Sequence, residues 1–232
     1  MPIVFSPLTL FFSAVLMGLA QHSLGMGYLA WFSLVPFIFV LNRINEIKHY
    51  VLVGFIWGFT YFLIVIFWLA NNIGTTPLIG MVSMICAVLY CTLNFIFICL
   101  LIKILKYFFC EKWYWYFPFL WVSVEYIRNM DLLTGGPWTS LANTQLDFLT
   151  LIQNAEIMGI YGISFWIVLI NILIYNYLLY PYKENIVKFI IIFMLPWFTG
   201  KFLQERLEMD DYKSLDVAIV QPNIHLSQKW KK

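Results

Sequence analysis

Long apolar stretches separated by short polar segments are the feature that most constrains the fold of this chain. Seven of them approach the roughly 20 residues that an α-helix needs to cross a bilayer: Pro7–Gln21, Gly25–Leu41, Tyr50–Ala70, Pro77–Ile102, Trp113–Ile127, Ile157–Tyr180 and Ile186–Gly200. Backbone groups in lipid must be hydrogen-bonded within the chain, so we expect helices and not strands. The sequence therefore predicts an all-α polytopic membrane bundle of about seven transmembrane helices over residues 1–200.

The composition excludes a soluble domain. Hydrophobic residues make up 62% of the 232 residues and charged residues only 11%, whereas a soluble domain carries about a quarter of charged residues. The net charge of +2 is too small to suggest a nucleic-acid partner. The N-terminal run has no Lys or Arg before it and no clear cleavage site, so we expect a retained first helix instead of a removed signal peptide.

The basic residues predict the orientation of the bundle. The segments after the second, fourth and sixth stretches carry seven of them: Arg43, Lys48, Lys103, Lys106, Lys112, Lys183 and Lys188. The segments after the first, third and fifth stretches carry only Arg128, at the edge of the fifth. Basic loops stay in the cytoplasm. We therefore expect a cytoplasmic N-terminus and a C-terminal tail on the outer side of the membrane.

The composition changes abruptly after Gly200. Residues 201–213 are rich in charge and are interpreted as a polar connector. The run Leu215–Val220 is β-branched and apolar, which is typical of a buried strand. One strand is not stable alone. Residues 214–232 are therefore predicted to begin a further domain, completed by another polypeptide or by a longer protein of which this chain is a truncated form.

Polar residues of the membrane region gather between Trp121 and Phe148. Glu125 and Arg128 are three residues apart on one predicted helix, so they share a face and are expected to pair. Charged residues at membrane depth are costly, and this favours a functional role. The structural alternative is that the helix ends near Arg128 and both groups pair at the interface.

The segment Gly135-Gly136-Pro137-Trp138 follows directly. Its glycines and proline disfavour a regular helix. One interpretation is a re-entrant loop that shapes a pocket for a lipid or substrate. In the other, Trp138 is an ordinary interfacial anchor.

Other residues suggest packing rather than chemistry. The four cysteines lie in or beside one apolar stretch with no C-x-x-C spacing and no His among them, so we expect no metal site or disulfide. Gly159 and Gly162 are spaced for close helix packing. No catalytic motif is visible.

Several motifs, in this order, resemble those of the apolipoprotein N-acyltransferase family, the inner-membrane enzymes that complete bacterial lipoprotein maturation. They are WVSVEYIR at 121–128, TGGPW at 134–138, NTQ at 143–145, MGIYGISF at 158–165 and VAIVQPNIHLSQKW at 217–230. The resemblance covers nearly the whole chain. It implies eight transmembrane helices with an α/β nitrilase-like domain on the periplasmic side, inserted between the last two, so that Leu215–Val220 is the first strand of that domain.

The resemblance also implies an activity. A Glu-Lys-Cys triad takes an acyl chain from a phospholipid onto the cysteine and passes it to the N-terminal diacylglyceryl-cysteine of an apolipoprotein, without a cofactor. All three triad residues lie beyond the position of Lys232, so no catalytic residue is assigned here and the chain alone is expected to be inactive. The alternatives are half of a split enzyme, with a separate nitrilase-domain polypeptide, and a non-enzymatic lipid-binding or transport subunit.

The resemblance assigns lipid-access or substrate candidates on the outer side of the membrane. They are Glu125, Arg128, Gly135, Pro137, Trp138, Gln145 and Trp230. The chain departs from the family pattern at Gly136, where the family has Phe, and at Lys231, where it has an acidic residue. It also has Asn143-Thr144 where the family has Tyr-Ser before the glutamine.

Overall fold

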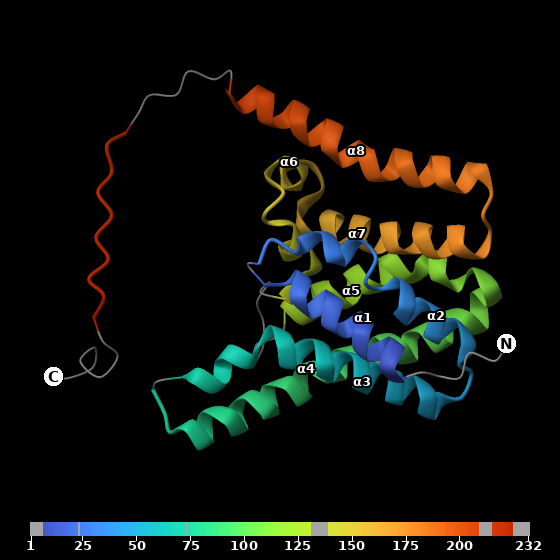
Figure 1. Cartoon of the computed structure of the whole chain (residues 1–232), viewed down its shortest axis with the longest axis horizontal. Coiled ribbons are helices and arrows are strands. Elements are labelled where there is room, and N and C mark those ends of the chain that lie inside the picture. The colour runs from blue at the N-terminus through green and yellow to red at the C-terminus, as the bar shows by residue number, and fades with distance from the viewer. Residues whose placement is uncertain (1–6, 23, 73, 131–138, 209–214, 225–232) are drawn as a thin grey trace.

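The computed structural model describes residues 7–22, 24–72, 74–130, 139–208 and 215–224, and the regular elements in these ranges are all helical (Figure 1). In chain order they are α1 (Pro7–Ala20), η1 (Gly27–Trp31), α2 (Val35–Arg43), α3 (Ile47–Val65), η2 (Phe67–Asn71), α4 (Pro77–Phe109), η3 (Cys110–Tyr116), α5 (Phe117–Asn129), η5 (Leu141–Gln145), α6 (Leu149–Ile152), α7 (Ala155–Leu179) and α8 (Lys183–Glu208). The helical class is thus confirmed.

Four helical stretches among the described residues are long and apolar enough to cross a bilayer. They are Ile47–Val65, Pro77–Asn129, Ala155–Leu179 and Lys183–Arg206. The second of these turns back at η3 and contains both α4 and α5. Two shorter apolar helical stretches, Pro7–Ala20 and Gly27–Arg43, precede them. The count of seven spans stays a prediction.

The second predicted stretch is broken in the middle. Helix η1 ends at Trp31, and α2 begins at Val35 with Pro36 in its first turn, where a missing N–H does no harm. Asn171 of α7 bridges the break: its Nδ2 donates to Ala30 O at 2.8 Å, and its Oδ1 accepts from Leu34 N at 2.9 Å. The break is therefore a fixed part of the core, because its backbone groups are hydrogen-bonded without water.

Helices α3 and α4 form a close hairpin because two glycines of α3 face α4. A Cβ on Gly54 would lie 2.6 Å from Ile96 Cα, and one on Gly58 would lie 2.9 Å from Phe95 Cβ. Small residues at such positions let helix backbones approach closely.

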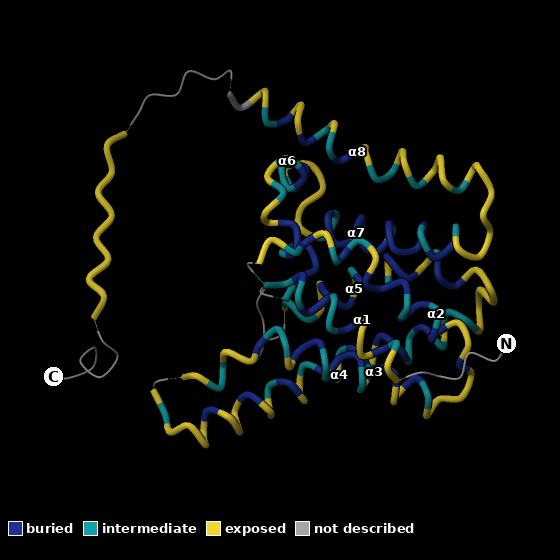
Figure 2. The backbone as a smooth tube through the Cα atoms, in the orientation of Figure 1, coloured by how far each residue is buried: buried dark blue, intermediate teal, exposed yellow. Residues whose placement is uncertain are grey.

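An aromatic cluster around Trp57 fills the centre of the bundle. Its ring lies 4.5 Å from that of Phe95, 5.1 Å from that of Phe37 and 6.3 Å from that of Trp121. Its indole N–H donates to Ser13 Oγ at 2.9 Å, so its one polar group is satisfied inside the core. Figure 2 shows the buried faces of the helices turned toward this centre and the exposed faces turned outward.

Close helix packing was predicted for the glycine pair in α7, Gly159 and Gly162, and the structure does not show it. Gly159 has φ +65° and ψ −179°, a kink that only glycine adopts readily, and a Cβ there would meet no atom within 4 Å. A Cβ on Gly162 would meet Met158 of its own helix. Gly159 is therefore needed for its backbone conformation, and Gly162 leaves room for the side chain of Met158.

Helix α8 is fastened to α7 by polar contacts around Pro196. Proline lacks an N–H, so Ile192 O, four residues earlier, loses its helical donor, and Trp166 Nε1 of α7 donates to it at 2.9 Å. Asn154 Nδ2 donates to Pro196 O at 2.7 Å. A Cβ on Gly200 would lie 1.8 Å from Thr150 O, so the two backbones touch.

The described part of the tail consists of a helical extension and an exposed run, and its assignment to a further domain stays a prediction. Helix α8 continues past Gly200 to Glu208, supported by an ion pair between Arg206 and Glu156 at 3.0 Å. Residues 215–224 are exposed and contain no strand. A β-strand needs a second strand to which its backbone is hydrogen-bonded. The described residues contain no strand with which the run 215–224 could pair.

Candidate functional site

A buried polar cluster lies where α5, η5 and α7 meet. Helix α5 ends with Glu125, Arg128 and Asn129, which are spaced three and four residues apart and so project from one face. The polar face points inward, toward η5, and not toward lipid. Among the described residues, Glu125 is the one Asp, Glu, Lys or Arg that is buried.

Glu125 and Arg128 form the predicted ion pair inside the protein. Glu125 is only 4% exposed, and its Oε1 lies 3.8 Å from Arg128 Nη2. The same oxygen accepts a 2.6 Å hydrogen bond from the backbone N–H of Leu141. The carboxylate therefore fixes the start of η5 as well as pairing with the arginine.

The pair retains hydrogen-bonding capacity. Within the described part of the chain, Glu125 Oε2, Arg128 Nε and Nη2, and Asn129 Oδ1 have no hydrogen-bond partner. Buried polar atoms without partners are costly and rare, and each calls for an explanation such as water, an ion or a functional role. A carboxylate beside a guanidinium presents both an acceptor and donors to a polar substrate group.

Ser140 connects the cluster to α1 and α3. Asn129 Nδ2 donates to Ser140 Oγ and to Tyr161 OH, both at 3.2 Å. Gln21 Nε2 donates to Ser140 O at 3.1 Å and to Tyr61 OH at 3.0 Å. Ser140, which precedes η5, is thus hydrogen-bonded by Asn129 of α5 and by Gln21 after α1.

Gln145 holds the other end of η5. It is fully buried, and its Nε2 donates to Gly27 O at 3.1 Å while its Oε1 accepts from Trp31 Nε1 at 2.8 Å. A Cβ on Gly27 would lie 1.9 Å from Thr144 O, which makes this close approach possible only for glycine. Irregular backbone within a membrane protein requires this kind of internal satisfaction.

The structure brings together three of the seven candidate residues from the sequence. Glu125 binds the start of the segment 140–145 and pairs with Arg128, and Gln145 lies at its end. Gly135, Pro137, Trp138 and Trp230 lie outside the described residues.

The sequence pattern did not predict three further members of the cluster, Gln21, Asn129 and Ser140. Gln21 is a polar residue directly after an apolar helix, and such residues are usually solvated. The signal that identifies it is spatial, since its partner Ser140 is 119 residues away in the chain.

A cavity of about 470 Å³ adjoins the cluster. It is lined by Gln21, His22, Ile66, Trp68 and Thr139, among others, so it shares Gln21 with the polar network. His22 Nε2 donates to Ile64 O at 2.9 Å, which leaves Nδ1 as an acceptor in the neutral ring. The cavity therefore joins apolar walls to polar groups at one end, as in small-molecule sites.

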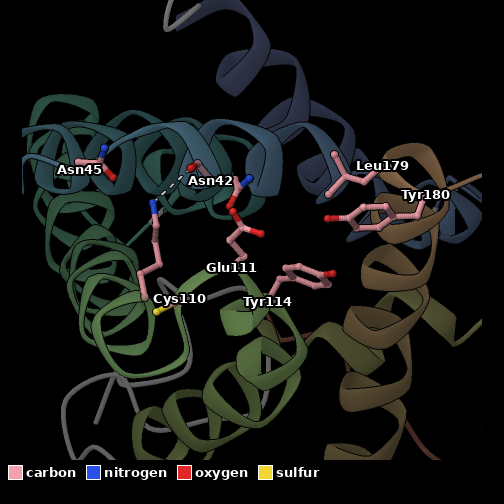
Figure 3. Close-up of a pocket in the computed structure, with 8 residues that line it drawn as sticks. Asn42, Asn45, Cys110, Glu111, Tyr114, Leu179 and Tyr180 are labelled. Carbon is pink, nitrogen blue, oxygen red and sulfur yellow. Dashed lines mark hydrogen bonds between the residues drawn. The ribbon is translucent and has the colours of Figure 1, made fainter.

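A second cavity, of about 370 Å³, lies at the opposite end of the bundle, where Figure 3 shows side chains from α2, η3 and the end of α7. Lys106 lines it and donates to three carbonyl oxygens at the end of α2, those of Leu41, Asn42 and Ile44, at 2.7–3.3 Å. Its ammonium is thus a cap for that helix end. Figure 1 shows the ends of α2 and α4 and the turn from α7 to α8 at this same end of the bundle.

Comparisons with known proteins place this arrangement in a family. A family model for the apolipoprotein N-acyltransferase N-terminal domain matches residues 13–173, which include the whole buried polar cluster. The chain belongs to this family.

Several curated relatives are named apolipoprotein N-acyltransferase. The one from Geobacter metallireducens is 30% identical over 94% of this chain and 43% of its own length. The one from Treponema denticola, numbered 1, is 27% identical over 86% of this chain and 37% of its own. The one from Pasteurella multocida is 24% identical over 98% of this chain and 45% of its own. The chain thus spans less than half the length of these N-acyltransferases.

Proposed function

We propose that this chain is the membrane part of a phospholipid-dependent N-acyltransferase that acts on the N-terminal diacylglyceryl-cysteine of apolipoproteins. The observation that carries the proposal is the family match over residues 13–173, with the buried Glu125–Arg128 pair inside it. In this role the polar cluster holds η5 at one edge of the bundle, next to a cavity with apolar walls where a lipid enters.

The chemistry is transfer of an acyl chain through a thioester. A cysteine thiolate attacks the ester carbonyl of the phospholipid and releases a lysophospholipid, and the substrate amine then attacks the thioester, forming an amide and restoring the thiol. Cys86, Cys91 and Cys99 lie on α4, and Cys110 follows it. Cys99 is fully buried among apolar residues, away from the polar cluster. We therefore assign the nucleophile to a nitrilase-like domain outside these 232 residues.

The proposal includes an orientation in the bacterial inner membrane. The end that carries Lys106 faces the cytoplasm, because basic residues concentrate there. The polar cluster, the 470 Å³ cavity and the C-terminal end of α8 then face the periplasm. The exposed residues 215–224 are suited to pair with strands of the catalytic domain, in the same polypeptide or in a separate one.

A mass-spectrometric assay tests the assignment of the nucleophile. The purified chain is incubated in detergent with phospholipid and a diacylglyceryl-cysteine peptide, and both protein and peptide masses are measured. The proposal predicts neither an acyl-thioester on any of the four cysteines nor an N-acylated peptide. An acyl group on any of the four cysteines, or an N-acylated peptide, would overturn it. The full-length N-acyltransferase from Geobacter metallireducens serves as the positive control.

A further inference from the structure

The hairpin of α3, η2 and α4 projects beyond the rest of the bundle at the end opposite Lys106 (Figure 1). The projecting part consists of residues 67–72 and 74–85, here called the arm. It comprises η2, the turn and the beginning of α4. The other described helices of the bundle end before they reach the arm (Figure 1), so they do not cover it. Lipid, water or another protein must therefore surround the arm.

The length of α4 exceeds what an upright helix needs to cross a bilayer. Helix α4 has 33 residues, and the 29 residue steps from Pro77 to Lys106 extend over about 44 Å at about 1.5 Å each. The hydrocarbon core is about 30 Å thick. If α4 stood upright with Lys106 at one boundary, roughly nine residues, those of the arm from Pro77 to Ile85, would lie beyond the other boundary.

The surface of the arm is apolar and carries no charge. Its large exposed side chains are Phe67, Trp68, Leu78, Ile79, Met81 and Val82, each about half exposed or more. Between Tyr50 and Ile102 the chain has no Asp, Glu, Lys or Arg. An apolar surface of this kind does not remain in contact with water in a stable protein.

The turn of the arm is satisfied by its own hydrogen bonds. Thr76 Oγ1 caps the start of α4 by accepting from Ile79 N at 3.4 Å, and Asn72 Oδ1 accepts from Gly74 N at 2.9 Å. A Cβ on Gly80 would lie 2.7 Å from Ala70 O, so the two sides of the hairpin touch here. The polar side chains of the arm are thus uncharged, and apart from Ser83 on α4 they lie at its turn.

We propose that the arm binds the lipid bilayer itself, with α3 and α4 inclined so that the arm lies within the apolar and interfacial layers of the leaflet farther from Lys106. Three observations favour lipid over a protein partner. The arm lacks the charged rim that surrounds protein interfaces. Its polar side chains, apart from Ser83, lie at the turn, where Asn72 and Thr76 accept backbone hydrogen bonds. Trp68 lies beside that turn, as aromatic residues do at the membrane interface.

This position of the arm has a consequence for the neighbouring cavity. Ile66 and Trp68 line the 470 Å³ cavity and stand at the base of the arm. With the arm in the leaflet, the cavity opens toward lipid instead of water. The environment of the arm does not depend on the proposed acyl-transfer function.

Site-directed spin labelling of the full chain in phospholipid bilayers tests the proposal. The native cysteines are replaced by alanine, helicity is verified by circular dichroism, and labels are placed at Leu78 and Val82 of the arm. Reference labels at Ile191, an exposed apolar residue of α8, and at Lys48, an exposed charged residue, define the lipid and water environments. Collision rates with oxygen and with a water-soluble nickel chelate are measured at each site.

The arm labels are expected to match Ile191. Their oxygen collision rate is high, and their nickel collision rate is about tenfold below that at Lys48, because the hydrocarbon layer excludes water and polar solutes. A nickel rate like that of Lys48 would show an arm in water and overturn the proposal. Low rates with both reagents would show that protein covers the arm and would overturn it equally.

Discussion

At the scale of single residues, polar side chains inside this bundle replace the water that irregular backbone otherwise requires. Backbone segments that are not α-helical are hydrogen-bonded by the side chains of Glu125, Gln145 and Asn171. Lys106 donates hydrogen bonds to the end of α2 in the same way. The family motif around Glu125 therefore has a structural explanation that does not depend on contact with substrate.

Replacement of Glu125 by alanine is expected to lower the free energy of unfolding by about 3–5 kcal/mol, because it leaves Arg128 buried without its counter-charge and Leu141 N without its acceptor. Glu125→Gln keeps an oxygen for Leu141 N and loses less. Glu205→Ala removes an exposed ion pair with Lys201 and changes stability by about 1 kcal/mol or less. Denaturant unfolding in detergent measures all three. Equal losses for Glu125→Ala and Glu205→Ala would contradict the account.

Lys106→Met is expected to lower the free energy of unfolding by about 2 kcal/mol, since carbonyl oxygens at the end of α2 lose a charged donor. Lys103→Met is the matched control one helical turn away, where no hydrogen bond of the ammonium is found among the described residues. Both substitutions remove one basic residue from the same end. A similar stability of the two variants would show that the cap contributes nothing.

At the scale of elements, apolar length predicted where helices lie, and the departures from a regular helix depend on side chains from other elements. Residues 32–34 break the second predicted stretch, and Asn171 of α7 bridges the break. The segment 139–145 lies between two predicted stretches, and Glu125 of α5 binds the start of η5 within it. A sequence pattern records the spacing of residues along one helix and does not record such partners. The ion pair of Glu125 and Arg128 was predictable because its spacing is local.

The attachment of α8 to α7 gives a prediction for Gly200. In Gly200→Ala the new methyl group meets Thr150 O, so the C-terminal half of α8 is forced away from α6 and α7. We expect a loss of about 1–3 kcal/mol, typical of overpacking. Hydrogen exchange should accelerate in residues 196–206 more than in 183–195.

The control for Gly200→Ala is Phe198→Ala, at a side chain that is 72% exposed. Its exchange pattern should resemble that of the unaltered chain. Uniform acceleration along α8 in the Gly200 variant would show that contacts around Thr150 do not determine where this helix is attached.

At the scale of the whole molecule, the distribution of basic residues agrees with the arrangement of helix ends, while the number of spans remains a prediction. Single-cysteine variants in a background without native cysteines test the orientation in intact cells. A membrane-impermeant maleimide should label Asp147→Cys and Lys201→Cys from outside, and Lys48→Cys and Lys183→Cys only after the cells are opened. The reverse pattern would invert the proposed topology.

The central claim is that this chain supplies the membrane part of an N-acyltransferase and not its nucleophile. The most direct measurement joins residues 1–232 to the part of the Geobacter metallireducens relative that this chain does not match and assays N-acylation of a diacylglyceryl-cysteine peptide by mass spectrometry. The account predicts product from the chimera and none from the chain alone. Product from the chain alone, or none from a folded chimera, would contradict it.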